Sequence, residues 1–248
     1  IRYTSTSRGL GDVYKRQISS NQVEISLAIG GICGTDLHYY KHGGFGEIKL
    51  KEPMVLGHEV SGHITKIGSK VTNVNLGQLV SVSPSRPCNK CSFCLEGSQI
   101  HCVNMKFYGS AMPFPHIQGA FRETLIANDY QCIPADGLTS GEAAMAEPLA
   151  VCLHAIKQAG SIFGKKVLVT GSGPIGTLCV LAARRAGAAE IVVTDISNSA
   201  LSYSSLVGAD ITINSLENYS SLEKFQSGKG FFDIALECSG SSLSLIHI

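Results

Sequence analysis

The chain has 248 residues, with 20 basic against 19 acidic side chains and a formal net charge of +1. That balance gives no basis for nucleic-acid or membrane-surface binding, and 44% hydrophobic against 16% charged residues excludes a disordered chain. No apolar run is long enough to cross a bilayer, so we expect a globular protein with neither nucleic-acid nor membrane partners. Nine cysteines and 27 glycines are the informative counts.

Both ends of the chain read as translated sequencing adapter. Residues 12–17 read DVYKRQ and residues 243–248 read LSLIHI. The first hexapeptide can be encoded by GATGTGTATAAGAGACAG, and the reverse complement of that DNA encodes the second. We therefore expect 1–17 and 243–248 to be adapter-derived scar and the remaining 18–242 to be a gene fragment.

The pattern of the remaining chain changes once. From Val23 to about Pro148, short alternating stretches between Gly- and Pro-containing turns indicate antiparallel β structure. From Gly164 onward, apolar strands alternate with helices, which indicates a parallel sheet with helical crossovers. The expected elements of this part are strands at 166–170, 191–195, 211–213 and 231–237 and helices at 174–186 and 199–207. With a joining helix over roughly 141–160, the sequence predicts an α/β chain of two domains, 18–156 and 157–242.

Four cysteines form the strongest signal of the first half, at the spacing Cys88-x2-Cys91-x2-Cys94-x7-Cys102. No hydrophobic period supports burying all four in a core. Thiolates at these gaps can close on one Zn²⁺ as a structural all-sulfur site. An iron–sulfur cluster is chemically allowed but lacks the usual Cys-Pro ending, and the odd total of cysteines counts against a disulfide framework.

A second set of metal ligands is spread more widely. Cys33 follows Gly30-Gly31-Ile32, and His58-Glu59 lies between Gly57 and Gly62. A thiolate, an imidazole and a carboxylate form a plausible three-ligand zinc site with a fourth position for water or substrate. Taken singly, Cys33 would be interpreted as a buried apolar residue, and His58-Glu59 as a pair of surface residues.

A nucleotide-binding motif opens the second half. The apolar strand 166–170 runs directly into Gly171-Ser-Gly173-Pro174-Ile175-Gly176 and a helical stretch. The first two glycines suit a tight turn and close pyrophosphate approach, and the third suits helix–strand packing. Asp195 ends the next strand, where it can accept hydrogen bonds from ribose hydroxyls and repel a 2′-phosphate, which favours NAD over NADP. Its alternative role is to cap the following turn.

Together these motifs resemble the medium-chain dehydrogenase/reductase family, in its zinc-containing alcohol dehydrogenase group. Gly57-His58-Glu59-x2-Gly62-x5-Gly68 is similar to that group's signature, and the four-cysteine lobe and the nucleotide motif follow in its order. The resemblance covers essentially all of 18–242. It implies a GroES-like β-rich catalytic domain and a truncated Rossmann domain, with one catalytic zinc, one structural zinc and NAD. In such enzymes a zinc ion polarises an alcohol oxygen and hydride passes to the nicotinamide.

Ligand roles follow from the resemblance. Cys33 and His58 match catalytic zinc ligands, and the four lobe cysteines match the ligands of the structural zinc. Glu147, in Ala146-Glu147-Pro148-Leu149, matches the third ligand of the polyol branch, and Glu59 is an alternative or transient ligand. The sequence does not choose between the two glutamates.

Two neighbours of Cys33 also match family positions. Thr35 takes the place of the hydroxyl that relays the substrate proton, and Asp36 that of the carboxylate that orients the zinc-bound histidine. Both residue types are also common in ordinary turns after glycine.

Within the family, the stretches around Cys33 and His58 resemble sorbitol and polyol dehydrogenases, whereas 107–121 and 146–151 resemble the L-idonate 5-dehydrogenase group. The resemblance implies oxidation of a sugar-acid hydroxyl, L-idonate to 5-keto-D-gluconate, with sorbitol-type polyols as alternative substrates. Lys106, His116 and Arg122 are candidate partners of a substrate carboxylate, although surface solvation explains each of them. Tyr39 either lines the substrate pocket or belongs to the core. A hypothesis of another class is a non-catalytic zinc-ribbon binding module.

Further expectations concern the whole protein. We expect 18–242 to bind zinc but to aggregate or show negligible turnover, because a doubly wound domain has about six strands and only about four precede residue 242. The full-length protein is expected to be a homo-oligomer, a dimer or tetramer. Metal-binding and unpaired cysteines suit a cytoplasmic location.

Overall fold

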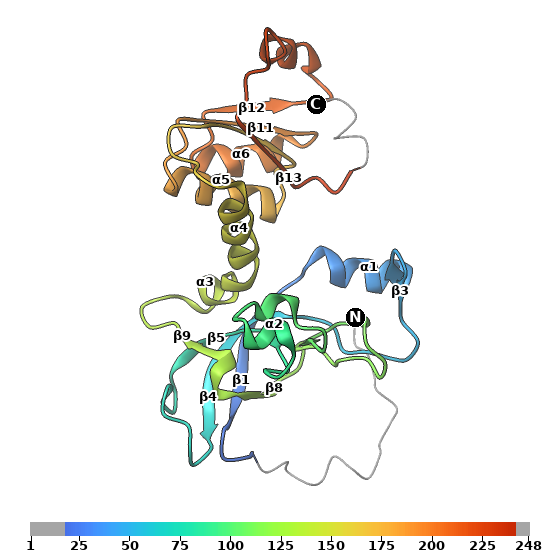
Figure 1. Cartoon of the computed structure of the whole chain (residues 1–248), viewed down its shortest axis with the longest axis vertical. Coiled ribbons are helices and arrows are strands. Elements are labelled where there is room, and N and C mark those ends of the chain that lie inside the picture. The colour runs from blue at the N-terminus through green and yellow to red at the C-terminus, as the bar shows by residue number, and fades with distance from the viewer. Residues whose placement is uncertain (1–17, 242–248) are drawn as a thin grey trace. The chain divides into compact units, whose positions relative to one another are not determined.

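The computed structural model describes residues 18–241 (Figure 1), so both predicted adapter-derived segments lie outside the described residues. The chain divides into two compact units, one ending at Glu147 and the other beginning at Pro148. The helix α4 (Ala146–Ala159) contains this division. The predicted domain boundary at 156/157 falls later, inside the same helix.

The first unit is built on an antiparallel five-stranded sheet in the order β8-β1-β4-β5-β9. Its strands are β1 (Gln22–Gly31), β4 (Glu59–Ile67), β5 (Leu79–Val82), β8 (Thr124–Asn128) and β9 (Cys132–Pro134). In β1 the fully buried Val23 and Ile25 alternate with more exposed residues, as a sheet with one covered face requires. The antiparallel β structure predicted for this half is confirmed.

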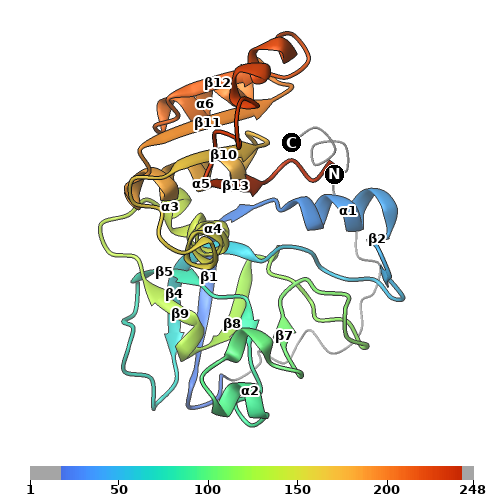
Figure 2. The same cartoon turned by 45° about the horizontal axis from the view of Figure 1, so that its top comes forward.

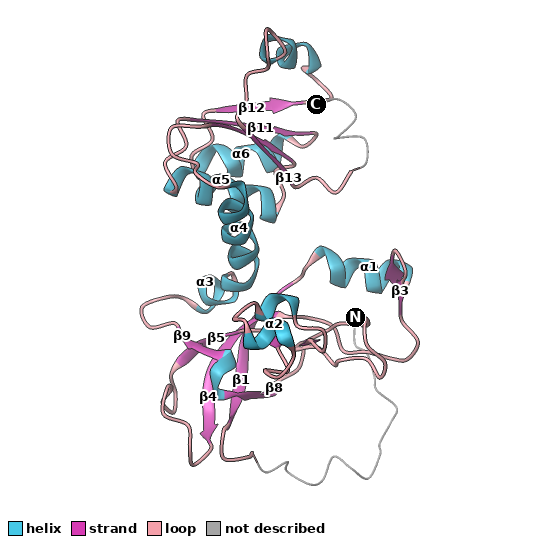
Figure 3. Cartoon of the chain, viewed as in Figure 1, coloured by secondary structure: helices cyan, strands magenta, loops and turns pink. Residues whose placement is uncertain are grey.

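Short elements complete the first unit. They are α1 (Gly34–His42), β2 (Gly44–Phe45), β3 (Ile48–Lys49), β6 (Ser85–Arg86), α2 (Ser92–Leu95), η1 (Gln99–His101), β7 (Lys106–Phe107), η2 (Asp129–Gln131) and α3 (Ser140–Ala144). Figure 3 shows that strands and loops dominate this unit, whereas helices accompany the sheet of the second.

The second unit holds a parallel four-stranded sheet in the order β12-β11-β10-β13 (Figure 2). Its elements are β10 (Lys166–Thr170), α5 (Pro174–Arg185), β11 (Glu190–Asp195), α6 (Asn198–Leu206), β12 (Ile211–Asn214), η3 (Tyr219–Phe225) and β13 (Ile234–Glu237). The central strands β10 and β11 are nearly continuous runs of buried Val, Ile and Leu, because helices and loops cover both faces of a parallel sheet. This confirms the α/β prediction.

The joining helix differs from its prediction. One helix was expected over 141–160, and the structure has two, α3 and α4, separated at Met145. Pro148 has no backbone N–H to donate to the carbonyl four residues earlier, so one continuous helix cannot form there. In the structure the proline lies in the first turn of α4, where that donor is not needed. Across residues 18–241, no helix has the length and apolar character needed to cross a membrane.

Candidate functional site

The first unit brings together a thiol, an imidazole and a carboxylate. One ligand atom each from Cys33, His58 and Glu59 lies within 4.8 Å of the others. Such spacing suits donors that share one ion at about 2.0–2.3 Å, and sulfur, nitrogen and oxygen are the donors that zinc takes. The three residues are called the open cluster below. The residues present therefore fit a zinc ion.

Strand pairing explains how residues so far apart in sequence meet. β1 and β4 are antiparallel, and the register places Gly31 opposite Glu59. Cys33 follows the end of β1 and caps the N-terminus of α1, and His58 precedes the first residue of β4. A Cβ atom on Gly31 would collide with the Glu59 side chain. Glycine at position 31 thus leaves the space that the carboxylate occupies.

Asp36 holds the two loops of the open cluster in place. Its Oδ2 accepts from the backbone N–H of Cys33 at 3.1 Å, and its Oδ1 accepts from that of Gly57 at 2.9 Å. The same Oδ1 lies 3.9 Å from Nδ1 of His58, beyond hydrogen-bonding distance, and this buried nitrogen has no hydrogen-bond partner among the described residues. Asp36 therefore contacts the ligand loops through their backbone N–H groups and does not hydrogen-bond to the His58 ring.

Burial sets the electrostatics of this cluster. His58 is 5% exposed, and its ring lies 5.3 Å from that of Phe107. Burial raises the pKa of the Cys33 thiol, and the backbone N–H and hydroxyl of Thr35 offset this in part. Burial likewise raises the pKa of Glu59, against the opposing effect of His58. Burial thus shifts both groups toward their neutral forms, and a bound cation would shift them toward their charged forms.

Glu147 lies near the open cluster without belonging to it. Burial raises the pKa of its carboxyl, His58 lowers it, and the charges of Glu59 and Asp36 raise it further. The two glutamates are thus within electrostatic reach of the same imidazole. Only Glu59 has an oxygen inside the three-residue cluster.

The four-cysteine lobe forms the second ligand group. The sulfur atoms of Cys88, Cys91, Cys94 and Cys102 all lie within 4.8 Å of one another. Cys102 Sγ accepts from the backbone N–H of Cys88 at 3.2 Å, and Cys91 and Cys94 are placed by the short helix α2. Four sulfur donors without an open position fit a closed zinc site.

Backbone donors prepare part of the lobe for a metal. The N–H of Lys90 is the main cause that lowers the pKa of Cys88 to about 6, and the N–H of Cys94 is the main cause that lowers that of Cys91. Burial instead raises the pKa of Cys94 to about 12. A metal ion would supply the charge that the buried thiol needs to ionise.

In the second unit, the glycine motif forms the turn between β10 and α5. Gly171 has φ +89°, and a Cβ there would lie 2.5 Å from the backbone N of Ser239. A Cβ on Gly176 would collide with the carbonyl of Gly171. Gly173, the N-cap of α5, is exposed and has open space at its Cβ position. The first and third glycines therefore serve packing, and the middle one leaves the N-terminus of α5 accessible, as an anion site requires.

Asp195 ends β11 beside this turn, at the predicted place. Its Oδ2 accepts from the backbone N–H of Ser172 at 2.6 Å, and its Oδ1 accepts from that of Ser197 at 2.8 Å. The carboxylate thus caps the following turn, and it also braces the glycine motif. Each oxygen keeps a lone pair for a further donor. The sequence pattern gave no signal for the part that Ser172 plays.

Two of the other candidates, Tyr39 and His116, are buried. Tyr39 is 3% exposed, and its hydroxyl accepts from the N–H of Ala111, so it belongs to the core. Both ring nitrogens of His116 are engaged, Nε2 by the N–H of Lys51 at 2.8 Å and Nδ1 by the carbonyl of Pro113 at 2.9 Å. This buried histidine is therefore not available as a cationic partner for a substrate.

The two remaining candidates for a partner of the substrate carboxylate, Lys106 and Arg122, are exposed. Lys106 lies in β7, and Arg122 donates through Nε to the carbonyl of Gly119. Arg122 also lines a small hollow of about 170 Å³ together with Gly30 and Phe121. Gly30 lies near the end of β1, and Cys33 follows that end. The hollow therefore lies beside the strand that leads to the open cluster.

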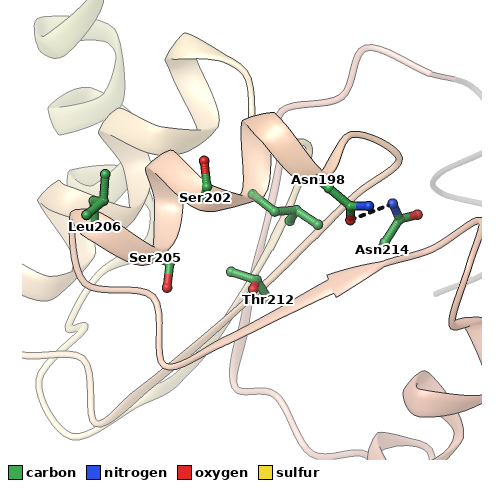
Figure 4. Close-up of a pocket in the computed structure, with 7 residues that line it drawn as sticks. Asn198, Ser202, Ser205, Leu206, Thr212 and Asn214 are labelled. Atoms are coloured by element: carbon green, nitrogen blue, oxygen red, sulfur yellow. Dashed lines mark hydrogen bonds between the residues drawn. The ribbon is translucent and has the colours of Figure 1, made fainter.

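A larger hollow of about 550 Å³ lies between α6 and β12 (Figure 4). Asn198 and Asn214 line one end, where Asn214 Nδ2 donates to Asn198 Oδ1 at 2.8 Å. The Oδ1 of Asn214 already accepts from the N–H of Leu216, and Asn198 Nδ2 donates to Glu217. None of the residues lining this hollow carries a charge, and none belongs to the predicted nucleotide motif.

Comparisons with known proteins bear on these sites. The alcohol dehydrogenase GroES-like domain model matches residues 19–137, and the zinc-binding dehydrogenase model matches residues 174–246, so the two together cover well over half of the chain.

Individual relatives agree. The L-idonate 5-dehydrogenase (NAD(P)(+)) of Escherichia coli is 42% identical over 228 residues, 92% of this chain and 65% of that protein. Bovine sorbitol dehydrogenase is 37% identical over 91% of this chain and 63% of its own length. The crystal structure of the E. coli enzyme superposes with a TM-score of 0.86 at 41% identity, over 92% of this chain and 65% of that one. The chain thus spans slightly less than two thirds of the length of these relatives.

Proposed function

Because the chain belongs to the zinc-binding alcohol dehydrogenase family, we propose that it is part of an enzyme that oxidises a secondary hydroxyl of a sugar acid and transfers hydride to NAD. L-idonate is the leading substrate and 5-keto-D-gluconate its product. The observation that carries this proposal is the open cluster of Cys33, His58 and Glu59, with three donors and no fourth protein ligand among residues 18–241. The 42% identity to a protein named L-idonate 5-dehydrogenase supports the substrate.

Cys33, His58 and Glu59 would hold the catalytic zinc, and Glu147, which lies within electrostatic reach of His58, is the alternative third ligand. Bound there, zinc would supply Lewis acidity to the substrate hydroxyl. The Thr35 hydroxyl, which hydrogen-bonds to the Cys33 thiol, would accept the proton of the substrate hydroxyl. Asp36 would keep the ligand loops fixed during this transfer.

The nucleotide would be bound by the second unit. The free N–H groups at the start of α5, beside Gly173, suit the pyrophosphate. Asp195 would accept from the ribose hydroxyls, and its charge would disfavour a 2′-phosphate. We therefore propose NAD over NADP. An Asp195→Ser variant should lower the ratio of NADH to NADPH affinity, and an unchanged ratio would refute this role.

The substrate carboxylate needs a cationic partner. Since both ring nitrogens of His116 are engaged, the exposed Arg122 is the better candidate. Arg122→Gln should raise KM for L-idonate while leaving KM for sorbitol nearly unchanged, because only the acid carries a negative charge. Equal effects on both substrates would assign Arg122 to packing.

The decisive experiment is turnover on the chain and on a version extended to the length of its relatives. Zinc-loaded protein with NAD is given L-idonate, sorbitol or ethanol separately, and NADH formation is followed at ~340 nm. We expect the extended version to prefer L-idonate and its His58→Ala variant to lose turnover. No turnover of the extended version with any of the three would refute the proposal. A preference for sorbitol would favour the polyol alternative, which the bovine relative supports.

A further inference from the structure

Three thiols that play no part in the proposed chemistry meet beneath the first turns of α5. Cys179 lies in α5, Cys152 in α4, and Cys238 directly after β13. Cys238 Sγ contacts Cys179 Sγ at 3.9 Å, and the Cys152 thiol donates to the carbonyl of Ile175 at 3.4 Å. All nine cysteines of the chain fall within the described residues, and none of them forms a disulfide bond there.

The contact between Cys179 and Cys238 joins two segments of the nucleotide site. Cys179 is 2% exposed and Cys152 is fully buried, whereas Cys238 retains some solvent exposure. A reagent in solution therefore reaches Cys238 first and finds Cys179 as the adjacent thiol. Contact with Cys152, together with burial, raises the pKa of Cys179 to about 12 against the lowering effect of Cys238. Contact with Cys179, together with burial, raises the pKa of Cys238. Few thiolates are present at neutral pH, so the reaction should be slow.

We propose that Cys179 and Cys238 form an oxidative modification site, at which exchange with a low-molecular-weight disulfide such as oxidised glutathione joins them by a disulfide bond. The Cys238 thiolate attacks one glutathione sulfur, which forms a mixed disulfide and releases one glutathione thiolate. The Cys179 thiolate then attacks Cys238 Sγ and releases the second glutathione. The two protein thiols lose two electrons and two protons, which leave as two reduced glutathione molecules.

This bond would disturb the glycine motif. The sulfur atoms must approach from 3.9 Å to about 2.05 Å. The segment after β13 packs closely on the motif, since a Cβ on Gly171 would lie 2.5 Å from Ser239 N and one on Gly176 would lie 3.5 Å from Cys238 Cβ. Movement of that segment toward α5 must therefore shift the turn. The expected loss of nucleotide affinity rests on the proposed function, whereas formation of the bond does not.

Peptide mapping tests the bond itself. The zinc-loaded chain is incubated with oxidised glutathione, remaining thiols are alkylated, and the protein is cut with trypsin without reduction. Cleavage after Lys and Arg places Cys179 in 167–184, Cys238 in 230–248 and Cys152 in 123–157. We expect 167–184 linked to 230–248, released by dithiothreitol, absent in Cys179→Ala and in Cys238→Ala, and retained in Cys132→Ala. Linkage of 167–184 to 123–157, glutathione adducts alone, or no linkage would overturn the proposal.

Nucleotide binding tests the consequence. NADH is titrated by fluorescence against the reduced and the oxidised chain, and we expect a roughly tenfold higher Kd after oxidation, restored by dithiothreitol. If the reduced chain does not bind NADH, the nucleotide role proposed for the glycine motif fails, while the peptide map still decides the disulfide. If the reduced chain binds and the oxidised chain binds equally well, the coupling of the bond to the nucleotide site is wrong.

Discussion

The two units present their candidate sites in opposite ways. In the first unit, the sulfur, nitrogen and oxygen atoms of side chains converge, in the open cluster and in the cysteine lobe. In the second, the candidate surface is bare backbone at the start of α5, exposed because Gly173 carries no side chain, while Gly171 and Gly176 allow close packing behind it. A metal ion needs directed electron pairs, which only side chains of the right type supply, whereas a pyrophosphate needs N–H groups that it can approach closely. A side-chain site should fail when atoms are removed, and a backbone site when they are added.

Removal of one lobe sulfur should have the largest effect on stability. Cys91→Ser is expected to lower the zinc content by one equivalent per chain and the free energy of unfolding by several kilocalories per mole, because a structural metal stabilises the fold that binds it. Metal analysis and urea unfolding measure both quantities. Cys132→Ala, at a buried cysteine outside the lobe, is the control that should keep its zinc. Full zinc content in Cys91→Ser would mean that the lobe does not act as a side-chain site.

Addition of one methyl group tests the backbone site. Gly171→Ala should cost about 1–3 kcal/mol, because an L residue is strained at φ +89° and its Cβ meets Ser239. Gly173→Ala has open space and should change stability by less than about 0.5 kcal/mol.

The two glycine variants together separate folding from binding. NADH affinity should fall in Gly173→Ala as well, since its Cβ occupies the surface that the pyrophosphate approaches. Thermal unfolding and NADH titration are the measurements. Wild-type affinity in Gly173→Ala would show that the nucleotide does not approach α5 there.

A smaller effect is expected from the carboxylate that supports the side-chain site. Asp36 accepts two backbone N–H groups, one with each oxygen, and an asparagine can accept with only one. Asp36→Asn should lower the zinc affinity of the open cluster by about 10–100-fold, as loss of such support does at other metal sites. Competition with a chelator measures it, and the lobe zinc serves as the internal reference. Equal weakening of both zinc ions would indicate general unfolding instead.

Short-range signals carried most of what the sequence predicted. The lobe cysteines lie within a few residues of one another, and the glycine motif is continuous with its strand and helix, so local spacing was enough to predict each feature. Every strand and helix predicted for the second half is present, with small differences at the ends; the last strand begins at Ile234 rather than at 231.

Long-range pairing was beyond the sequence pattern. The register of β1 against β4 brings Glu59 and His58 beside Cys33, and no local feature specifies that register. The environment of His116 was likewise beyond the sequence pattern, because its Nε2 accepts from the backbone N–H of Lys51, a residue 65 positions away. The break at Met145, in contrast, has a local cause in the sequence. Pro148 disfavours one straight helix over 141–160, and the predicted single helix did not take this into account.

The smallest predicted effect concerns a carboxylate that binds backbone in the second unit. Asp233 Oδ2 accepts from the backbone N–H of Lys166, at the start of β10, at 2.8 Å. This hydrogen bond, with a smaller contribution from Lys165, lowers the pKa of Asp233 in the folded chain. A carboxyl with a lowered folded pKa stabilises the fold above its unfolded pKa of about 4, and that stabilisation is lost as the pH falls through the folded value. Asp233→Asn should therefore unfold at a slightly lower temperature than wild type at pH 7, and the two curves should converge in acid. A difference in unfolding temperature that persisted at low pH would mean that the stabilisation by this hydrogen bond does not depend on the charge of Asp233.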